Sequence, residues 1–261
     1  MIRNLLVMGL LLTVVLNSCS QELSLYEKRL YIYQDDTLPY RILLPENYDA
    51  SKKYPLIYFL HGAGERGNDN EKQLVHGAKL FLREDIRKNY PAIIVFPQCP
   101  VESYWSNVIA TTSETGQRSH TFLPDGEPTA AMVLAQQLLK ELINSYPVDK
   151  KRIYVGGLSM GGMGTFEIVR RNPNLFAAAF PICGGAHPSA ATKMTTVSWW
   201  IFHGAKDDRV LPVFSATMTE ALRKAGADVK FTLYPDANHN SWDAAFAEPG
   251  LLPWLFSHTK K

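Results

Sequence analysis

Short, continuous apolar runs recur along the chain, and stretches with helical spacing separate them. The runs cover residues 56–60, 92–96, 153–155, 176–182, 197–202 and 229–234. A strand of a parallel sheet is covered on both faces, so it is apolar at almost every position. From residue 129 to 146 the apolar positions instead recur every three or four residues, as in an amphipathic helix. This alternation predicts an α/β fold with a mostly parallel central sheet and helices on both faces.

The remaining elements follow from local signals. Residues 25–34 and 37–44 predict two strands joined at Asp35-Asp36, an N-terminal antiparallel hairpin. Residues 71–88 and 213–225 predict helices, the second ending at Gly226. The segment 101–127 has no clean period, and we expect a long loop there.

The N-terminus predicts export. Arg3 precedes an apolar run at residues 5–16, which is too short to span a bilayer and has the layout of a secretory signal. Leu16-Asn17-Ser18-Cys19 resembles the lipobox of bacterial lipoproteins, which implies an acylated Cys19 and a membrane-anchored protein in the periplasm or on the cell surface. The alternative is an ordinary signal peptide cleaved nearby. We expect a signal at residues 1–19 and a single catalytic domain at residues 20–261.

Composition limits the possible partners. The net charge of +2 and the lack of a long basic run argue against nucleic-acid binding. No residues have metal-ligand spacing and no phosphate-binding G-x-G-x-x-G follows a strand, so no metal or cofactor is expected. Cys99 and Cys183 follow strands that two others would separate, about 14 Å apart, and are predicted to be free thiols.

The sequence of residues 153–164 carries the strongest chemical signal. Residues 157–161, Gly-Leu-Ser-Met-Gly, match G-x-S-x-G between a predicted strand and a predicted helix. In that setting the serine lies on a strained turn, with its hydroxyl exposed above the sheet. A Cβ at Gly157 or Gly161 would collide with neighbouring backbone. Ser159 is therefore the candidate nucleophile.

A nucleophilic serine needs a base and an acid that orients the base. His239 follows the last predicted strand and Asp207 the strand before it, which gives the chain order Ser, Asp, His. Loops at the carboxyl ends of parallel strands share one rim of the sheet. Asp208 remains an alternative acid. His61 and His203, each before a glycine at a strand end, are interpreted as shaping those turns.

The developing oxyanion needs two N–H donors. We expect them from the backbone of Met160 and of Ala63, where Gly62 and Gly64 permit close approach of the main chain. Glu65 and Arg66 are expected to pair with each other and brace that loop. Trp105 and Trp242 are candidates for an aromatic wall against an acyl or sugar group; the alternative is that they pack beneath loops.

Four segments together resemble the α/β-hydrolase superfamily: residues 61–67, 157–162, 202–207 and 239–242. The similarity is greatest to secreted bacterial esterases such as feruloyl esterases and polyhydroxybutyrate depolymerases, a group also labelled predicted peptidases. The resemblance implies Ser159, Asp207 and His239 as the catalytic triad, with Ala63 and Met160 as oxyanion donors. One departure concerns the acid, which is often followed by Val-Pro, whereas Val210-Leu211-Pro212 interposes a leucine here.

The function expected from these features is that of a serine carboxylesterase acting through an acyl-enzyme. Its substrate would be a small-molecule or glycan ester, such as an acylated glycan or a phenolic ester. A serine peptidase using the same residues and a non-catalytic binding protein of the same fold are the alternatives. Acyl specificity and oligomeric state do not follow from the sequence, and a membrane is expected only through the lipid anchor.

Overall fold

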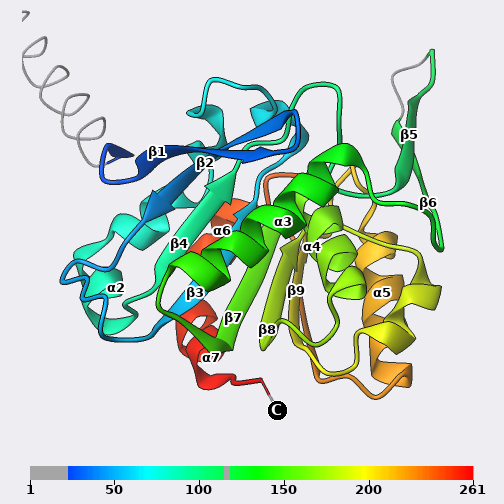
Figure 1. The fold of residues 1–261 in the computed structure, drawn as a ribbon. Helices are drawn as coiled ribbons and strands as arrows, with labels where there is room; N and C mark the ends of the chain where they lie inside the picture. Colours follow the sequence, from blue (N-terminus) through cyan, green and yellow to red (C-terminus); the bar gives the residue numbers. More distant parts are fainter. Residues whose placement is uncertain (1–22, 115–117, 261) are drawn as a thin grey trace, which may run out of the picture.

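An eight-stranded sheet forms the centre of the protein (Figure 1). The computed structural model describes residues 23–114 and 118–260. Along the sheet the strands are β1 (Glu27–Tyr33), β2 (Asp36–Leu43), β4 (Ile93–Pro97), β3 (Tyr54–Leu60), β7 (Val148–Leu158), β8 (Ala178–Ile182), β9 (Ser198–Gly204) and β10 (Val229–Tyr234).

The strand directions confirm the predicted fold class. β1 pairs antiparallel with β2, and β2 pairs antiparallel with β4; every other neighbouring pair from β4 to β10 is parallel. The strands β3, β4 and β8 are buried at every position, as their continuous apolar sequences require. β4 and β8 are separated by β3 and β7, and Cys99 and Cys183 are free and buried, as predicted.

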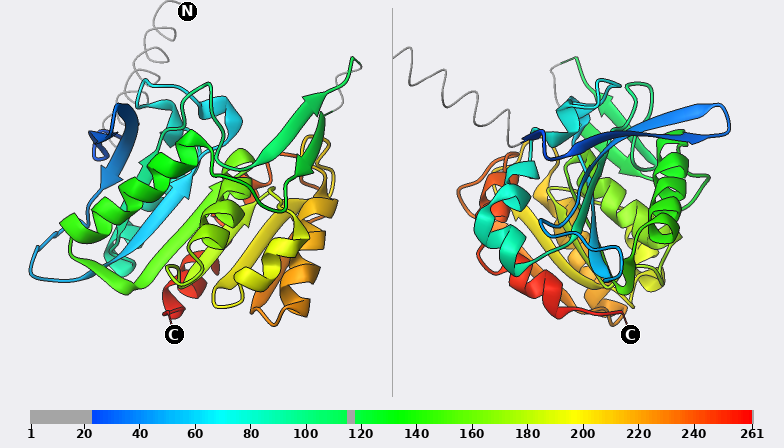
Figure 2. Two further views of the ribbon diagram at one scale, coloured as in Figure 1. Left: turned by 45° about the vertical axis from the view of Figure 1, so that its right-hand side comes forward. Right: turned by 60° about the vertical axis from the view of Figure 1, so that its left-hand side comes forward.

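Helices cover both faces of the sheet (Figures 1 and 2). One face packs against α3 (Ala130–Ser145), α4 (Met160–Arg171) and α5 (Pro212–Lys224), and the other against α2 (Glu84–Asn89), α6 (Trp242–Ala247) and α7 (Leu251–Ser257). Thr129 is the N-cap of α3, since its side-chain oxygen accepts the Met132 N–H at 3.2 Å. Each face therefore has its own apolar core.

The helix predicted over residues 71–88 was wrong as a single element. The segment forms two short 3₁₀ turns, η2 (Lys72–Leu74) and η3 (Ala78–Leu82), followed by α2. Gly77 lies between the two turns at φ +83°, in the left-handed region, which interrupts helical geometry. After the last strand the chain forms two further short helices, α6 and α7.

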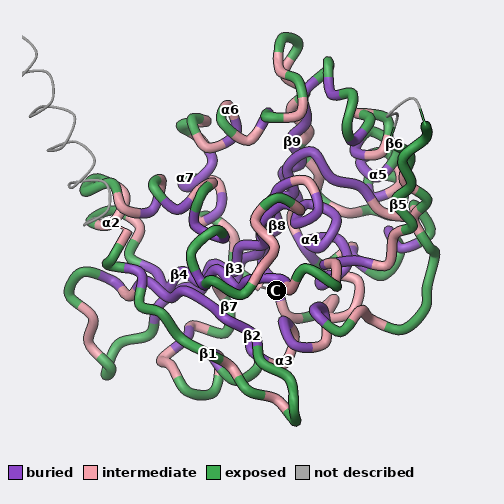
Figure 3. Tube along the Cα trace, turned by 90° about the horizontal axis from the view of Figure 1, so that it is seen from above, coloured by how far each residue is buried: buried purple, intermediate pink, exposed green. Residues whose placement is uncertain are grey.

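The predicted loop at 101–127 contains a β-hairpin that the sequence analysis missed. β5 (Val108–Thr112) and β6 (Arg118–Phe122) pair antiparallel in a separate two-stranded sheet. Figure 1 shows the hairpin projecting beyond the central sheet, and in Figure 3 most of its length is exposed. A hairpin with both faces largely in solvent has no need for alternating apolar residues, so its sequence carried no strand signal.

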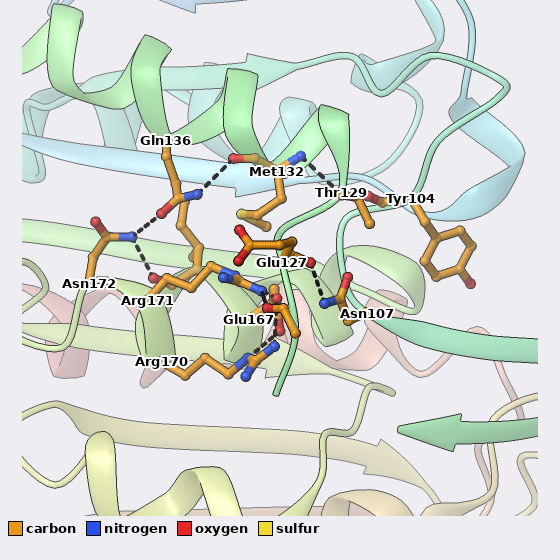
Figure 4. A network of polar contacts seen from close by, with 12 residues as sticks. Tyr104, Asn107, Glu127, Thr129, Met132, Gln136, Glu167, Arg170, Arg171 and Asn172 are labelled. Carbon is orange, nitrogen blue, oxygen red and sulfur yellow. Dashed lines mark hydrogen bonds and ion pairs between the residues drawn. The ribbon is translucent and has the colours of Figure 1, made fainter. Parts of the chain in front are cut away.

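A buried ion-pair cluster fastens the chain after this hairpin to α4 (Figure 4). Glu167 is almost fully buried and binds both Arg170 and Arg171. Arg170 also donates to the carbonyl of Pro124 at 3.2 Å, and Arg171 to that of Gly126 at 2.7 Å. The same helix whose first turn follows Ser159 therefore holds the base of the hairpin with its last turn.

Residues 1–22, which include Cys19 and the predicted signal, lie outside the described residues. Among residues 23–114 and 118–260, no helix has both the length and the apolar character needed to cross a bilayer.

Candidate active site

Ser159 lies on a tight turn between the end of β7 and the start of α4. Its backbone has φ +53° and ψ −115°, and its N–H donates to the carbonyl of Ile182 at 2.9 Å. A non-glycine residue with positive φ is strained, and such strain is held only where the surroundings fix it. A Cβ on Gly161 would lie 1.8 Å from the carbonyl oxygen of Leu60, so only glycine fits there.

Three side chains from distant segments meet at this turn. The hydroxyl oxygen of Ser159 lies 3.0 Å from Nε2 of His239, and Nδ1 of the same ring lies 2.8 Å from Oδ2 of Asp207. Each residue follows the carboxyl end of a strand: Ser159 follows β7, Asp207 follows β9 and His239 follows β10. Because Nδ1 donates its proton to a carboxylate, Nε2 presents its lone pair to the serine hydroxyl. That is the arrangement of a base beside a nucleophile.

Asp207 is 3% exposed, and its carboxylate is hydrogen-bonded to other groups of the protein. Its Oδ1 accepts the backbone N–H groups of Arg209 at 2.9 Å and Val210 at 3.0 Å. Burial alone would raise the pKa of Asp207, but hydrogen bonds from His203, His239 and Val210 together hold that pKa well below its usual value. Asp208 points into solvent, with its side chain 83% exposed, and does not contact His239.

His203 is the residue at this site that the sequence analysis missed. It was interpreted as shaping a turn, yet its fully buried ring lies with Nε2 3.1 Å from Oδ2 of Asp207, the oxygen that His239 also contacts. Its position four residues before Asp207, at the end of β9, is the signal that could have indicated this contact.

The loop after β3 lies directly against the turn of Ser159. A Cβ on Gly62 would lie 2.8 Å from the Leu158 side chain, and a Cβ on Gly161 of α4 would lie 2.7 Å from the carbonyl oxygen of His61. Ala63, which begins the 3₁₀ turn η1 (Ala63–Glu65), follows directly in this loop. The backbone of Met160 occupies the first turn of α4, where N–H groups lack intrahelical partners. Gly64, by contrast, has open space around it, so the expected close approach there was wrong.

Arg66 braces this loop, although not through Glu65 as expected. Its guanidinium donates to the carbonyls of Ala63 at 3.1 Å and Val101 at 2.9 Å. Glu65 instead lies 3.8 Å from Nε2 of His76.

The two candidate tryptophans have different environments. Trp242 is half-buried; its ring lies edge-on to His239 at 5.4 Å between centroids, and its centroid lies 5.0 Å from that of His76. Trp105 is fully buried, packed against His61 and over Gly164. The proposal that Trp105 lines a substrate site was therefore wrong, since a side chain without exposed surface meets no substrate.

Aromatic side chains from the hairpin pack against α5 and the loop after β8. Phe122 of β6 packs edge-on against Phe214 of α5 at 5.1 Å, and His120 lies against both rings. A Cβ on Gly185, two residues beyond Cys183, would lie 3.0 Å from the Phe122 ring. Burial, followed by repulsion from Arg118 and His239, lowers the pKa of His120.

One trio in the described part of the chain has the spacing of a metal site. Cys183, Asp207 and His239 each offer a ligand atom, and these atoms lie within 4.8 Å of one another. Burial raises the pKa of the Cys183 thiol strongly, which disfavours the thiolate that a metal binds. Both Asp207 oxygens and Nδ1 of His239 already have hydrogen-bond partners, so these residues do not fit a resident metal.

This fold and this arrangement of serine, histidine and aspartate define a member of the α/β-hydrolase superfamily. The chain belongs to the esterase family described as "Putative esterase", which residues 34–244 match.

Three relatives indicate the range of similar proteins. A thermostable esterase of known crystal structure is 30% identical, with a TM-score of 0.81 over 92% of this chain and 64% of its own. A bifunctional acetylxylan esterase/xylanase of Neocallimastix patriciarum is 36% identical over 73 residues, which is 28% of this chain and 11% of that protein. A probable feruloyl esterase C of Aspergillus terreus is 25% identical over 67% of this chain and 56% of its own. The chain thus spans less than two thirds of each of these relatives.

Proposed function

We propose that this protein is a serine carboxylesterase that works through an acyl-enzyme. The observation that carries the proposal is the unbroken line of contacts from Ser159 through His239 to Asp207, at 3.0 and 2.8 Å. His239 is 23% exposed at its side chain while Asp207 is buried, so the line opens to solvent at the serine end. Membership of an esterase family supports the same chemistry.

In the first half of the reaction, Ser159 Oγ attacks the ester carbonyl carbon while Nε2 of His239 takes the hydroxyl proton. The resulting oxyanion would accept hydrogen bonds from the N–H groups of Met160 and Ala63. The bond to the alcohol oxygen then breaks as His239 returns the proton to the leaving alcohol. The products of this half are a free alcohol and an ester of Ser159.

In the second half, water attacks the acyl carbon and gives its proton to His239. The tetrahedral adduct collapses, the bond to Ser159 breaks, and His239 protonates Ser159 Oγ. A carboxylic acid leaves. Asp207 remains ionised throughout and holds the imidazole in the tautomer that both halves require.

The substrate class proposed is an acylated glycan or a phenolic ester. The names of two relatives, an acetylxylan esterase/xylanase and a feruloyl esterase, support this class. Trp242, which lies beside His239, and the Phe122–Phe214 pair of the hairpin and α5 offer partly exposed apolar rings, which suits an acyl or sugar group.

A panel of p-nitrophenyl acetate, feruloyl esters, acetylated glycans and peptide anilides tests the proposal. We expect ester cleavage, and a loss on the order of 10⁶ in kcat for Ser159→Ala. Cleavage of anilides without esters would favour a serine peptidase. Failure of a fluorophosphonate to label Ser159 would favour a binding protein without catalysis.

We further propose that the protein is exported and anchored through an acylated Cys19, an assignment supported by its sequence context alone. Two acyl chains suffice for stable membrane attachment. Metabolic labelling with palmitate, compared between the wild type and Cys19→Ala, tests it: a label retained in the variant would contradict the proposal.

A further inference from the structure

The inference concerns His203, which lies beneath the candidate acid at the end of β9 and has no exposed surface. Its Nε2 lies 3.1 Å from Oδ2 of Asp207 and 2.8 Å from the carbonyl oxygen of Val210. Its Nδ1 lies 2.7 Å from the hydroxyl of Ser215, which in turn lies 2.9 Å from the carbonyl of Gly184. The ring is therefore fixed at both nitrogens.

The proton on Nε2 follows from its neighbours. A backbone carbonyl and an ionised carboxylate only accept hydrogen bonds, so Nε2 carries a proton and donates to both. At Nδ1 the partner is a hydroxyl, which can accept or donate. Whichever way the Ser215 proton points, the ring donates to Asp207.

The N–H group of His203 donates to the same Asp207 oxygen that orients His239. Oδ2 of Asp207 receives Nδ1–H of His239 at 2.8 Å and Nε2–H of His203 at 3.1 Å. Oδ1 is held by two backbone N–H groups. Among the residues that the structure describes, removing His203 would leave Oδ2 bound to one side chain, the imidazole that Asp207 has to orient.

We propose that His203 is a positioning residue for ester hydrolysis, holding Oδ2 of Asp207 in line with Nδ1 of His239 and sharing the charge of that carboxylate. The inference rests on the proposed function, because it assigns Asp207 and His239 their roles. His203 itself touches no substrate.

Removing the His203 donor has two consequences. The carboxylate gains freedom to turn, which misplaces the His239 ring and lowers kcat without touching the substrate. The negative charge on Oδ2 is also shared with one donor fewer, so it stabilises the protonated His239 ring more strongly. The acid limb of the pH profile of kcat/KM then moves to higher pH.

Other charged and titratable groups near the pair do not mimic this shift. Cys183 at the end of β8 remains a thiol, because burial raises its pKa strongly. His120 on β6 has a lowered pKa, mainly from burial. Asp208 and Arg209 lie in the exposed part of the loop and pair with each other at 3.7 Å.

The test compares H203L, which removes both ring nitrogens, with H203Q, whose amide retains a donor. We expect H203L to lose roughly 10- to 100-fold in kcat, the value of one donor to a charged group, with little change in KM. Its acid limb should lie at higher pH, and H203Q should recover most of both effects. H61Q is the matched control, since His61 is also buried and also precedes a glycine, while its ring nitrogens bond to the backbone of Gly62 and Cys99 rather than to Asp207.

A merely structural role would lower the melting temperature of H203L and leave the acid limb in place, which would overturn the proposal. If H203L does not fold, Ser215→Ala replaces it: losing the Nδ1 partner should shift the acid limb in the same direction, by less. Unchanged kcat and pH profile in H203Q and Ser215→Ala would also overturn the proposal.

A readout without turnover separates this inference from the proposed function. The Nδ1 proton of His239 gives a strongly downfield NMR signal when bonded to a carboxylate. We expect H203L to move or broaden this signal and H203Q to retain it. If the wild type cleaves no ester yet the signal responds in this way, the proposed function fails, and only the hold of His203 on the Asp207–His239 contact stands. If esters are cleaved and the signal and kcat of H203L match the wild type, the positioning role fails alone.

Discussion

Nδ1 of His239 lies 2.8 Å from Oδ2 of Asp207, a carboxylate that is 3% exposed. The neighbouring Asp208 points outward and pairs with Arg209 at 3.7 Å. The difference follows from the turn after β9, which directs the backbone N–H groups of Arg209 and Val210 at Asp207 Oδ1. Two adjacent, chemically identical side chains therefore have very different consequences for the reaction.

This contrast gives the first prediction. Asp207→Asn should lower kcat on the order of 10⁴-fold, because an amide can donate to Nδ1 and leave the imidazole in the wrong tautomer. Asp208→Asn is the matched control and should retain the wild-type kcat. Steady-state kinetics on the same ester decide the matter, and equal losses in the two variants would contradict the assignment of the acid.

The second prediction concerns the glycines that let the turn of Ser159 approach β3. Gly161→Ala should destabilise the protein by about 3 kcal/mol or more, because its Cβ would lie 1.8 Å from the carbonyl oxygen of Leu60. Gly64→Ala is the control, since a Cβ there has no atom within 4 Å. Urea denaturation should show a change within about 0.5 kcal/mol for the control. Equal stability of the two variants would mean that the turn tolerates a wider gap.

Much of this architecture could be predicted from the sequence, because parallel strands are buried on both faces and leave continuous apolar runs. The G-x-S-x-G signature around Ser159 is local, so it could also be found. The features that the sequence did not predict are contacts between distant segments. The contact of His203 with Asp207 depends on how one turn folds back, and the burial of Trp105 depends on packing against α4.

The exposed hairpin was also not predictable from the sequence. β5 and β6 bury few of their residues, so no hydrophobic period records them. Their position depends on Glu167, Arg170 and Arg171 of α4, which hold the following loop through its carbonyl oxygens. A sequence pattern records which side chains avoid water, and it does not record which arginine reaches a distant carbonyl.

That cluster supplies the third prediction. Glu167→Ala should destabilise the protein by about 3 kcal/mol, because it leaves two largely buried guanidinium groups without their carboxylate. Glu220→Ala, at an exposed position of α5, is the matched control and should change stability by less than about 0.5 kcal/mol. Thermal and urea denaturation measure both, and similar values for the two would show that the arginines find other partners.

The fourth prediction is a pH dependence of stability caused by His61. Its Nε2 accepts the Cys99 N–H at 2.9 Å and its Nδ1 lies 2.6 Å from the carbonyl of Gly62, which fits a neutral ring. Burial lowers the pKa of His61 to about 4 from 6.5. The unfolded chain therefore binds the proton first as the pH falls.

The protein should therefore become less stable as the pH falls. The contribution of His61 is fully present above pH 6.5 and is lost as the pH falls from 6.5 toward about 4, by about 3 kcal/mol in total. In His61→Gln this part of the pH dependence should disappear. Free energies of unfolding in urea at pH 7 and pH 4.5 test it; an equal decline in both proteins would show that other groups cause the loss.

The last prediction separates the two tryptophans. Trp105 is fully buried, so Trp105→Ala should cost about 3–5 kcal/mol in stability, as large aromatic truncations in a core do. Trp242 is half-buried and borders His239 at 5.4 Å, so Trp242→Ala should act chiefly on the reaction. We expect kcat/KM to fall by roughly tenfold, the effect of losing about 1.4 kcal/mol of transition-state binding. Each variant is thus the control for the other. Trp105→Ala should change the unfolding midpoint more, and Trp242→Ala should change kcat/KM more. If Trp242→Ala left kcat/KM unchanged for feruloyl and acetyl esters alike, the Trp242 ring would not contribute to binding the acyl group.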